Sequence, residues 1–399
     1  MHASPSWPCR SVSGLAARSV SGPTSPLRPT CEAEPVNSAR DPVADLRRVA
    51  FLLERALEST YRVKAFRTAA AALAALPAED VALLAASGGL RGIKGIGERT
   101  ASVIEQSVAG VEPEYLIEVA ERTGGRLAAG GDELRTALRG DLHTHSDWSD
   151  GGSPIGEMAV TAAGLGHSYT ALTDHSPRLT VANGLTPQRL RRQLEVVGSV
   201  NDELAGAPAD FRLLTGIEVD ILTDGSLDQS EDLLTALDVV VSSVHSELRM
   251  PSGPMTARMI AAIENPHTDV LGHCTGRYVI DRSYGSSSLS SRTRSGKARP
   301  PSTFDAAAVF AACARTGVAV EINSRPERLD PPMALLRRAV AEGCLFAIDT
   351  DAHAPGQLDW QLIGCDRAMA AGVPAASIVN TWPLEDLLAW TRDHTHRPA

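Results

Sequence analysis

The pattern of hydrophobic and polar positions divides the 399-residue chain into four stretches. Residues 1–42 are rich in Ser, Pro and Arg and contain few large apolar side chains, which predicts a disordered tail. Residues 43–110 place apolar side chains at helical spacing, whereas residues 140–399 alternate strand-like apolar runs with helical ones. Residues 111–139 read as a helical, Gly-punctuated linker between these two regions. We therefore predict two folded domains joined by a linker.

The first predicted domain is all-helical. Leu46, Val49, Ala50, Leu53 and Leu57 trace one face of a helix. A second helix is expected near 63–76, ended by a proline at 77, and a third near 79–86. The domain then continues with the segment LRGIKGIGERTASVIEQSVAG.

This last segment places a Gly-Ile-Gly turn between two short helical stretches. Without a Cβ, Gly95 and Gly97 allow backbone amides at a helix N-terminus to approach a phosphate group closely. A plain helical turn would suffice for an isolated GxG, but here two basic side chains flank it. We take Lys94, Gly95, Gly97 and Arg99 as candidate residues for binding a phosphate group.

The second predicted domain contains a parallel sheet with crossover helices, because strand-like and helical runs alternate along it. Strands are expected at 141–145, 169–174, 213–219, 239–245, 270–273, 318–323 and 345–349. Seven such strands indicate an α/β barrel one strand short of eight. In barrels of this kind the chemistry lies at the carboxyl ends of the strands.

Metal-ligand residues follow these strand ends repeatedly. The stretch GDLHTHSDWSDGG places His143 and His145 two residues apart, so that both face one side of a strand. An isolated HxH would most simply be a surface strand with incidental histidines, but five further strands end in the same way. The candidate ligands are His143, His145, Asp150, His175, Glu218, His245, His273, Asp351 and His353.

Net charge and cysteine content limit the classes of protein to which this chain can belong. The net charge is −10, of which the residues after 110 carry −13 and residues 43–110 carry +2, so a cation-collecting domain follows a mildly basic one. Six cysteines form no CxxC pair or disulfide framework, and no apolar run is long enough to span a membrane. We therefore expect a cytoplasmic protein with no membrane association. An organelle transit peptide remains an alternative interpretation of residues 1–42.

Residues 43–110 resemble the N-terminal helical domain of family X DNA polymerases, through the stretch YRVKAFRTAAAAL and the helix-hairpin-helix that follows it. The resemblance implies binding to the DNA backbone without base reading. Members with lyase activity carry a Schiff-base lysine where this chain has Val103, so the lyase step has no nucleophile. About 30 residues of linker cannot hold a polymerase palm, so we expect no polymerase activity.

Residues 140–385 resemble the PHP family of metal-dependent phosphoesterases, through the motifs DLHTHSDWSDG, LTDHS, GIEVDI, SSVHS, GHCTGR and DTDAH. The resemblance implies a distorted (β/α)7 TIM-like barrel with up to three metals. It implies one metal at His143, His145, Glu218 and Asp351, and a second shared through Glu218 with His245 and His273. A third would be held by Asp150, His175 and His353. Asp349 and Asn323 would support these ligands.

The ligand set predicts phosphate ester hydrolysis, because two cations sharing a carboxylate can activate water and clamp phosphate oxygens. Arg249, Arg277 and Arg325 follow strand ends and could hold the phosphate, and we favour Arg277. The candidate catalytic residues are therefore Glu218, Arg277 and Asp351. Two to three divalent ions are expected, zinc first and manganese second.

The leading hypothesis is a phosphoesterase that acts on DNA ends, as a 3′–5′ exonuclease or 3′-phosphatase, with the helical domain holding the DNA backbone. A small-molecule phosphatase of the histidinol-phosphate type is the second hypothesis, in which the hairpin is a relic. The third is a non-catalytic DNA-binding protein with a structural metal barrel. Residues 279–301 form a Ser-rich, basic insertion that either touches nucleic acid or is merely tolerated by the fold. The sequence identifies no protein partner.

Overall fold

The computed structural model describes residues 40–205, 210–279 and 298–393. The described residues belong to one compact unit that spans residues 39–399. Most of the predicted tail and most of the predicted insertion at 279–301 lie outside the described residues.

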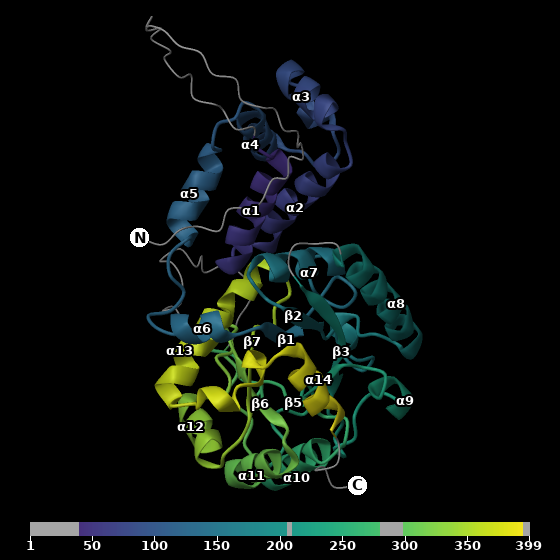
Figure 1. The fold of residues 1–399 in the computed structure, drawn as a ribbon, viewed down its shortest axis with the longest axis vertical. Helices are drawn as coiled ribbons and strands as arrows, with labels where there is room; N and C mark the ends of the chain where they lie inside the picture. The colour runs from purple at the N-terminus through teal and green to yellow at the C-terminus, as the bar shows by residue number, and fades with distance from the viewer. Residues whose placement is uncertain (1–39, 206–209, 280–297, 394–399) are drawn as a thin grey trace, which may run out of the picture. The chain divides into compact units, whose positions relative to one another are not determined.

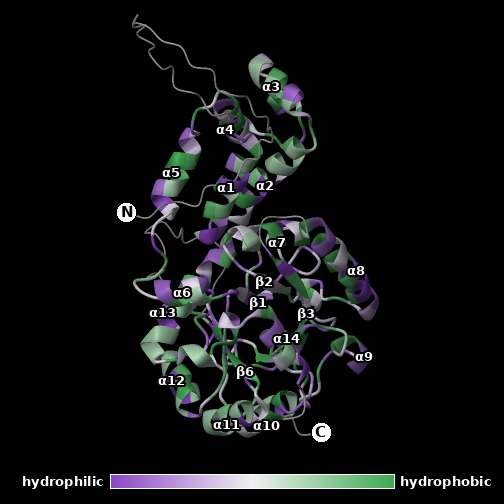
Figure 2. Ribbon diagram, viewed as in Figure 1, coloured by the Kyte–Doolittle hydropathy of each residue, from purple (hydrophilic) through white to green (hydrophobic). Residues whose placement is uncertain are grey.

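The helical region begins where the sequence pattern predicts it. Asp41 caps the first helix by accepting a hydrogen bond from the Val43 amide at 2.8 Å, and Pro42 occupies the first turn, where no intrahelical donor is needed. The helices are α1 (Pro42–Arg55), α2 (Thr60–Ala74), α3 (Ala78–Ser87), η1 (Leu90–Gly92) and α4 (Glu98–Val108). Their buried faces form one apolar core, and Figure 2 shows hydrophobic stretches in green along these helices.

One predicted core position of this region is corrected. Leu57 is not on the face of α1, because the helix ends at Arg55 and Leu57 has a left-handed backbone with φ of 53°. Its side chain packs instead against a cluster that contains Trp360. The helix therefore ends before Leu57, and Leu57 contacts the segment around Trp360, about 300 residues later in the sequence.

The linker is helical, as expected, and contains α5 (Glu114–Thr123) and α6 (Asp132–Ala137). Between these helices the backbone passes close to α13 (Gln361–Ala371), where a Cβ on Gly131 would lie 2.7 Å from the Asp366 amide nitrogen. Gly131 also has φ of 91°, so glycine is required there by both space and conformation.

The second region is a seven-stranded parallel sheet in the order β1 to β7 (Figure 1). Each strand lies within two residues of its predicted bounds. The strands are β1 (Gly140–Thr144), β2 (Tyr169–Leu172), β3 (Arg212–Asp220), β4 (Val239–Ser243), β5 (Val270–Leu271), β6 (Ala319–Asn323) and β7 (Phe346–Asp349). The end of β1 also bridges the residues after β7, through Thr144 and Ala352. The prediction of a seven-stranded TIM-like barrel is confirmed.

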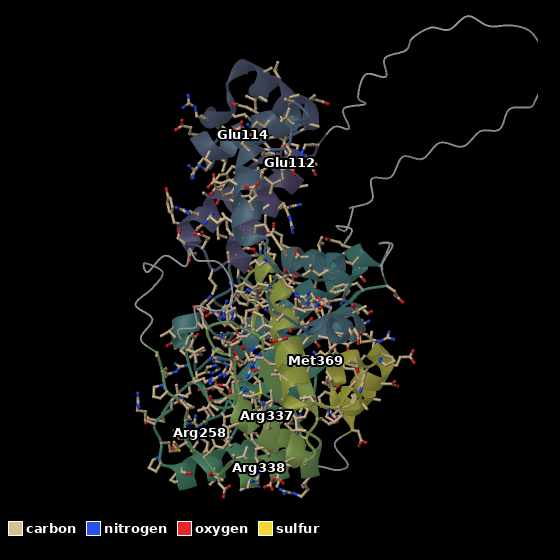
Figure 3. The ribbon with its side chains drawn as sticks, turned by 90° about the vertical axis from the view of Figure 1, so that its left-hand side faces the viewer. Glu112, Glu114, Arg258, Arg337, Arg338 and Met369 are labelled. Atoms are coloured by element: carbon tan, nitrogen blue, oxygen red, sulfur yellow. The ribbon has the colours of Figure 1, made fainter. Side chains whose placement is uncertain are left out.

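Helices connect the strands and lie around them (Figure 1). Figure 3 shows Arg337 and Arg338 of α12 and Met369 of α13 on the outside of this helical layer. The remaining elements are α7 (Ile155–Gly164), η2 (Thr180–Ala182), α8 (Pro187–Leu204), α9 (Glu231–Leu234), α10 (Ser252–Ile263), α11 (Ala306–Thr316), α12 (Met333–Ala341), η3 (Pro355–Trp360), η4 (Ala375–Ser377), η5 (Val379–Thr381) and α14 (Leu384–Arg392).

The interior of the barrel is apolar along the strands and polar at their carboxyl ends. One buried cluster takes side chains from all seven strands, and Trp382 and residues of α14 pack against it. Every second side chain of a strand points to the same side, so the residues two or four positions after those of this cluster lie above it, towards the carboxyl ends of the strands. Several of these residues are polar. Leu214 thus leads to Glu218, and Ala319 leads to Glu321. The apolar core therefore forms the floor of a polar site.

Among the described residues, no single helix has both the length and the apolar character needed to cross a membrane, although the bent pair α2 and α3 together meets those two criteria. The four described cysteines, Cys274, Cys313, Cys344 and Cys365, are buried thiols.

Replacing His167 with glutamine is expected to make the protein less sensitive to mild acid. His167 is 2% exposed, with its Nε2 3.1 Å from Arg135 Nη2, and burial followed by this guanidinium lowers its pKa to about 3. Because folding lowers this pKa, the unfolded protein binds a proton on His167 below about pH 6.5 that the folded protein does not bind. The wild-type protein therefore loses stability as pH falls from about 6.5 towards 3. The free-energy difference between wild type and variant should therefore change by up to about 2 kcal/mol from pH 7.5 to pH 5.

Urea unfolding of both proteins at the two pH values measures this difference, because the other titrating groups are common to both. A pH-independent difference would show that His167 is not the buried neutral group described above.

Candidate metal centre

Glu218, at the end of β3, lies at the centre of five histidines. Its Oε1 is 2.8 Å from His273 Nε2 and 3.2 Å from His245 Nε2. Its Oε2 is 2.8 Å from His175 Nδ1, 3.4 Å from His143 Nε2 and 3.6 Å from His145 Nε2. The side chain of Glu218 is fully buried. One buried carboxylate thus faces imidazoles from four other strand ends.

The polar atoms of this cluster are not satisfied by hydrogen bonds. Among the described residues no partner in hydrogen-bond geometry is found for either carboxylate oxygen of Glu218, for both ring nitrogens of His145 and His245, for His143 Nε2, or for Nδ1 of His175 and His273. Buried polar atoms without partners are costly, and their convergence on one point is the arrangement expected of metal ligands. The side chains present therefore fit a set of divalent cations.

Three groups of side chains bring ligand atoms within 4.8 Å of one another. They are His143, His145 and Asp351; then His175, Glu218 and His245; and then His145, Asp150, His175 and His353. Together with His273 on Glu218, these groups contain all nine predicted ligands. The grouping differs from the expected one, since His175 approaches Glu218 and His145 joins Asp150. Which ion each residue holds stays a prediction.

Electrostatics shifts the pKa values of the cluster in both directions. Burial acts to lower the pKa of His143 and His175, but Glu321 and Glu218 raise the pKa of His143 well above its usual value, and Glu218 with Asp150 raises that of His175 to about 10. Burial, with His353 and His175 nearby, lowers the pKa of His145 well below its usual value, so that this imidazole is neutral. Burial acts to raise the pKa of Glu218, but His245, His143 and His175 outweigh it and hold that pKa well below the usual range. A neutral imidazole and an ionised carboxylate are both able to coordinate a cation.

Glu321 on β6 is a site residue that the sequence analysis missed. Its Oε1 lies 2.6 Å from His143 Nδ1, and its Oε2 accepts from the backbone amide of His273. A carboxylate on Nδ1 fixes the tautomer of His143 and leaves Nε2 free for a metal. The sequence does contain a signal, a glutamate in the middle of the apolar run Val318–Asn323. A charged side chain inside a buried strand is costly unless it has a partner, so it indicates a site.

The two predicted supporting residues occupy different positions. Asn323 donates from Nδ2 to Asp351 Oδ2 at 3.2 Å, so it does contact a candidate ligand. Asp349 turns to the barrel wall, where its Oδ1 accepts from the Leu142 amide at 2.8 Å and from Asn380 Nδ2 at 2.9 Å. Asp349 therefore joins β7 to β1 and supports the site through the backbone.

The arginines near the site have different hydrogen-bond partners. Arg277 donates from Nε to the Arg328 carbonyl at 2.9 Å and from Nη2 to the Leu329 carbonyl, so its guanidinium is engaged with backbone. Arg328, which the sequence analysis did not select, donates to Asp351 Oδ2 at 2.8 Å and has a buried Nη1 without a hydrogen-bond partner among the described residues. Arg325 lies 3.6 Å from Asp351 Oδ1. The catalytic role of Arg277 stays a prediction.

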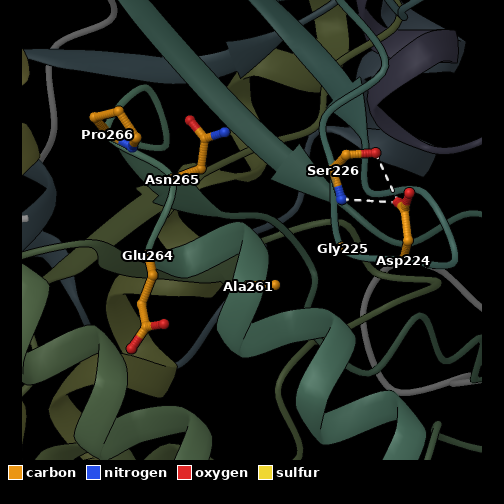
Figure 4. A pocket seen from close by; sticks show the side chains of 7 residues that line it. All are labelled: Asp224, Gly225, Ser226, Ala261, Glu264, Asn265 and Pro266. Atoms are coloured by element: carbon orange, nitrogen blue, oxygen red, sulfur yellow. Dashed lines mark hydrogen bonds between the residues drawn. The ribbon is translucent and has the colours of Figure 1, made fainter. Parts of the chain in front are cut away.

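A shallow surface pocket lies between the loop after β3 and the end of α10 (Figure 4). It is lined by Asp224, Gly225, Ser226, Ala261, Glu264, Asn265 and Pro266, and it contains none of the nine candidate ligands. The hydrogen bonds from Ser226 to Asp224 shown in Figure 4 complete a local turn. We assign the chemistry to the histidine cluster and not to this pocket.

Of the hairpin residues selected from the sequence, Lys94, Gly95 and Gly97 lie between η1 and α4, and Arg99 is in the first turn of α4. Lys94 and Arg99 are exposed, and the guanidinium of Arg99 lies 4.7 Å from the centre of the Tyr115 ring. Gly95 has φ of 98° and packs on Thr68, so it is required by the turn itself. The Gly97 amide donates to Thr100 Oγ1 at 2.9 Å, which engages the donor that was expected to meet a phosphate. DNA contact by these four residues stays a prediction.

Two domain families match the chain. Residues 38–111 match the helix-hairpin-helix domain, and residues 141–325 match the PHP domain. The order of the two domains agrees with the prediction.

The chain is also similar to several characterised or curated proteins. It is 35% identical over 255 residues to the DNA polymerase/3′-5′ exonuclease PolX of Bacillus subtilis, covering 64% of this chain and 41% of that protein. It is 33% identical over 138 residues to a probable phosphatase of Thermoanaerobacter sp., covering 33% of this chain and 52% of that protein. The chain therefore spans about half or less of the length of these two relatives.

Among solved structures, a histidinol phosphate phosphatase from Lactococcus lactis aligns with 59% of this chain and 94% of its own, at 17% identity and a TM-score of 0.40, which is too distant to support a conclusion. The domain matches and the geometry of the barrel are sufficient for the assignment. This chain carries a helix-hairpin-helix domain followed by a PHP domain.

Proposed function

We propose that the protein is a metal-dependent phosphoesterase that hydrolyses phosphate esters at DNA ends. The observation that carries the proposal is the convergence of five histidines on the buried carboxylate of Glu218, with at least one ring nitrogen of each lacking a hydrogen-bond partner among the described residues. A non-catalytic metal site would need only enough ligands to close one coordination shell. Nine candidate ligands around a shared carboxylate exceed that requirement.

The residues of the site would have different roles in hydrolysis. Bound divalent cations would supply Lewis acidity and an activated water. Glu218 would hold two cations at a short separation through its two oxygens, and Glu321 would keep the His143 ring aimed at the site. Arg328 and Arg325 lie against the two oxygens of Asp351, and Arg328 Nη1, which has no hydrogen-bond partner among the described residues, would be available to an anionic substrate.

The proposed cofactors are two to three divalent ions. Six histidines among nine candidate ligands favour zinc, and the three carboxylates also suit manganese.

The helical domain favours DNA over a small molecule as substrate. The similarity to a DNA polymerase/3′-5′ exonuclease extends over 64% of the chain, and the matched helix-hairpin-helix leaves Lys94 and Arg99 exposed. A phosphatase acting on a small ester is the second candidate, supported by the similarity to a probable phosphatase.

Three substrates separate the candidates: 3′-recessed duplex DNA, DNA that carries a 3′-phosphate, and histidinol phosphate. We expect metal-loaded protein to release nucleotides or phosphate from DNA ends at a kcat/KM well above that for histidinol phosphate. Preference for histidinol phosphate would make the small-molecule phosphatase the better assignment. Inactivity on all three, in protein shown to bind both metal and DNA, would favour the non-catalytic alternative.

Removing Lys94 and Arg99 together is expected to weaken duplex DNA binding. Each lost phosphate contact lowers the slope of log K against log salt by about 0.9, so the slope should fall by about 2 and affinity by roughly tenfold or more at physiological salt. Fluorescence anisotropy at several salt concentrations measures both quantities.

The matched control removes Arg337 and Arg338, two exposed arginines on α12 of the barrel (Figure 3). It changes the net charge equally and should leave the slope unchanged. Equal effects of the two double variants would show that general charge, and not the hairpin, attracts DNA.

A further inference from the structure

The last turn of α1 is in direct contact with η3, the segment that follows the candidate ligands Asp351 and His353. Glu54 Oε2 accepts a hydrogen bond from the Gly356 amide at 2.8 Å, and the Trp360 indole donates to the Arg55 carbonyl at 2.9 Å. A Cβ on Gly356 would lie 2.0 Å from the Phe51 carbonyl oxygen, so the two backbones touch. The helical domain thus packs against the metal-ligand segment itself.

Glu54 is held rigidly for this contact. It is 4% exposed, and its two oxygens accept from Arg67 Nε at 2.8 Å and Nη2 at 2.6 Å. Arg67 also lies 3.5 Å from Glu157 on α7, which ties the pair to the barrel a second time. A bidentate, buried pair of this kind has a fixed geometry, so it can place the Gly356 amide accurately.

The contact reaches the metal cluster through Gln357. The Gln357 side chain accepts from the backbone amide of His353 at 2.7 Å, and the His353 carbonyl accepts from the Gly152 amide at 2.7 Å. η3 therefore holds His353, and His353 in turn holds the loop that carries Asp150.

This support matters most for one of the three ligand groups. In the group formed by His145, Asp150, His175 and His353, the side chains of Asp150 and His353 are 38% and 17% exposed, whereas Glu218 and His145 are fully buried. Asp150 and His353 lie on loops beyond the strand ends, so the barrel walls alone do not position them.

We propose that Glu54 is a positioning residue that makes the helical domain part of this most exposed metal cluster. The helical domain then has two roles, since it offers a hairpin to DNA and also completes the support of a ligand group in the barrel. This inference rests on the metal binding of the proposed function. It is tested by zinc affinity, which is measured without any substrate.

The test compares Glu54→Gln with Asp45→Asn. Asp45 is a second buried carboxylate of α1, 7% exposed, and its partners Arg40 and Ser107 both lie in the helical region. Both substitutions neutralise a buried charge in the same helix, but only Glu54→Gln changes the contact with η3. Zinc titration of apo protein against a chelating indicator should show the weakest site of Glu54→Gln weakened about 10- to 100-fold, with the other sites unchanged. Asp45→Asn should match wild type.

A second variant keeps the test valid if Glu54→Gln folds poorly. Gln357→Ala removes the amide that caps His353 from a half-buried position and leaves the helical domain intact. It should weaken the same site. Wild-type zinc binding in both Glu54→Gln and Gln357→Ala would overturn the proposal, as would equal weakening in Asp45→Asn. Loss of hydrolysis in Glu54→Gln with normal zinc binding would also count against this positioning role. Weakened zinc binding in the two variants, with no hydrolysis by wild type, would instead leave the positioning role standing and count against the proposed catalysis.

Discussion

Replacing Glu218 with glutamine is expected to lower phosphate ester hydrolysis by roughly 10³-fold or more. The substitution preserves the shape of the side chain but removes the negative charge that faces five histidines within 3.6 Å. Without that charge, nothing at the centre of the cluster compensates two adjacent cations, and several kcal/mol of transition-state stabilisation are lost. Steady-state kinetics on a chromogenic phosphate ester, with saturating zinc or manganese, measures the loss.

Folding of this variant must be followed in parallel. Because Glu218 is surrounded by imidazoles and not by apolar packing, the metal-free variant should melt within a few degrees of metal-free wild type. Activity within a few-fold of wild type would contradict the bridging role of Glu218. A large fall in the melting temperature of the metal-free variant would instead show that Glu218 stabilises the barrel by itself.

Removing the metals from wild-type protein is expected to abolish hydrolysis and to lower the melting temperature by on the order of 15–25 °C. Purified protein should carry two to three equivalents of transition metal. Each ion that binds only the folded state adds about 4 kcal/mol when its concentration is 1,000 times its Kd, and in a domain of this size 1 kcal/mol corresponds to roughly 2 °C. Elemental analysis, calorimetry with and without chelator, and activity after adding zinc or manganese test this prediction.

The chelator experiment has an internal control in the Glu218→Gln variant, whose melting temperature should respond less to metal because a shared ligand is lost. Absence of metal in the purified protein, with no activity restored by either ion, would exclude the metalloenzyme assignment. Full activity in the presence of chelator would exclude it equally.

Local sequence determined the elements and most of the candidate ligands. Strands of two to nine residues between helical runs indicate a parallel sheet covered by helices, because such a sheet buries a continuous apolar strand on both faces. Each strand-end ligand is likewise visible in the chain, since alternation along a strand places residues such as His143 and His145 on one face. For this reason seven strands and nine converging side chains could be predicted without a structure.

Only the tertiary structure decided which side chains meet across strands. Glu321 reaches His143 from 178 positions away, Arg328 rather than Arg277 contacts Asp351, and Gly97 uses its amide to cap its own helix. Glu54 meets Gly356 across 302 positions, and no local pattern marks that contact. Strand and helix periods report which face a residue occupies, but partners so distant in sequence are selected by the packing of whole elements. The support of the metal site therefore became visible only when the helical region and the barrel were seen together.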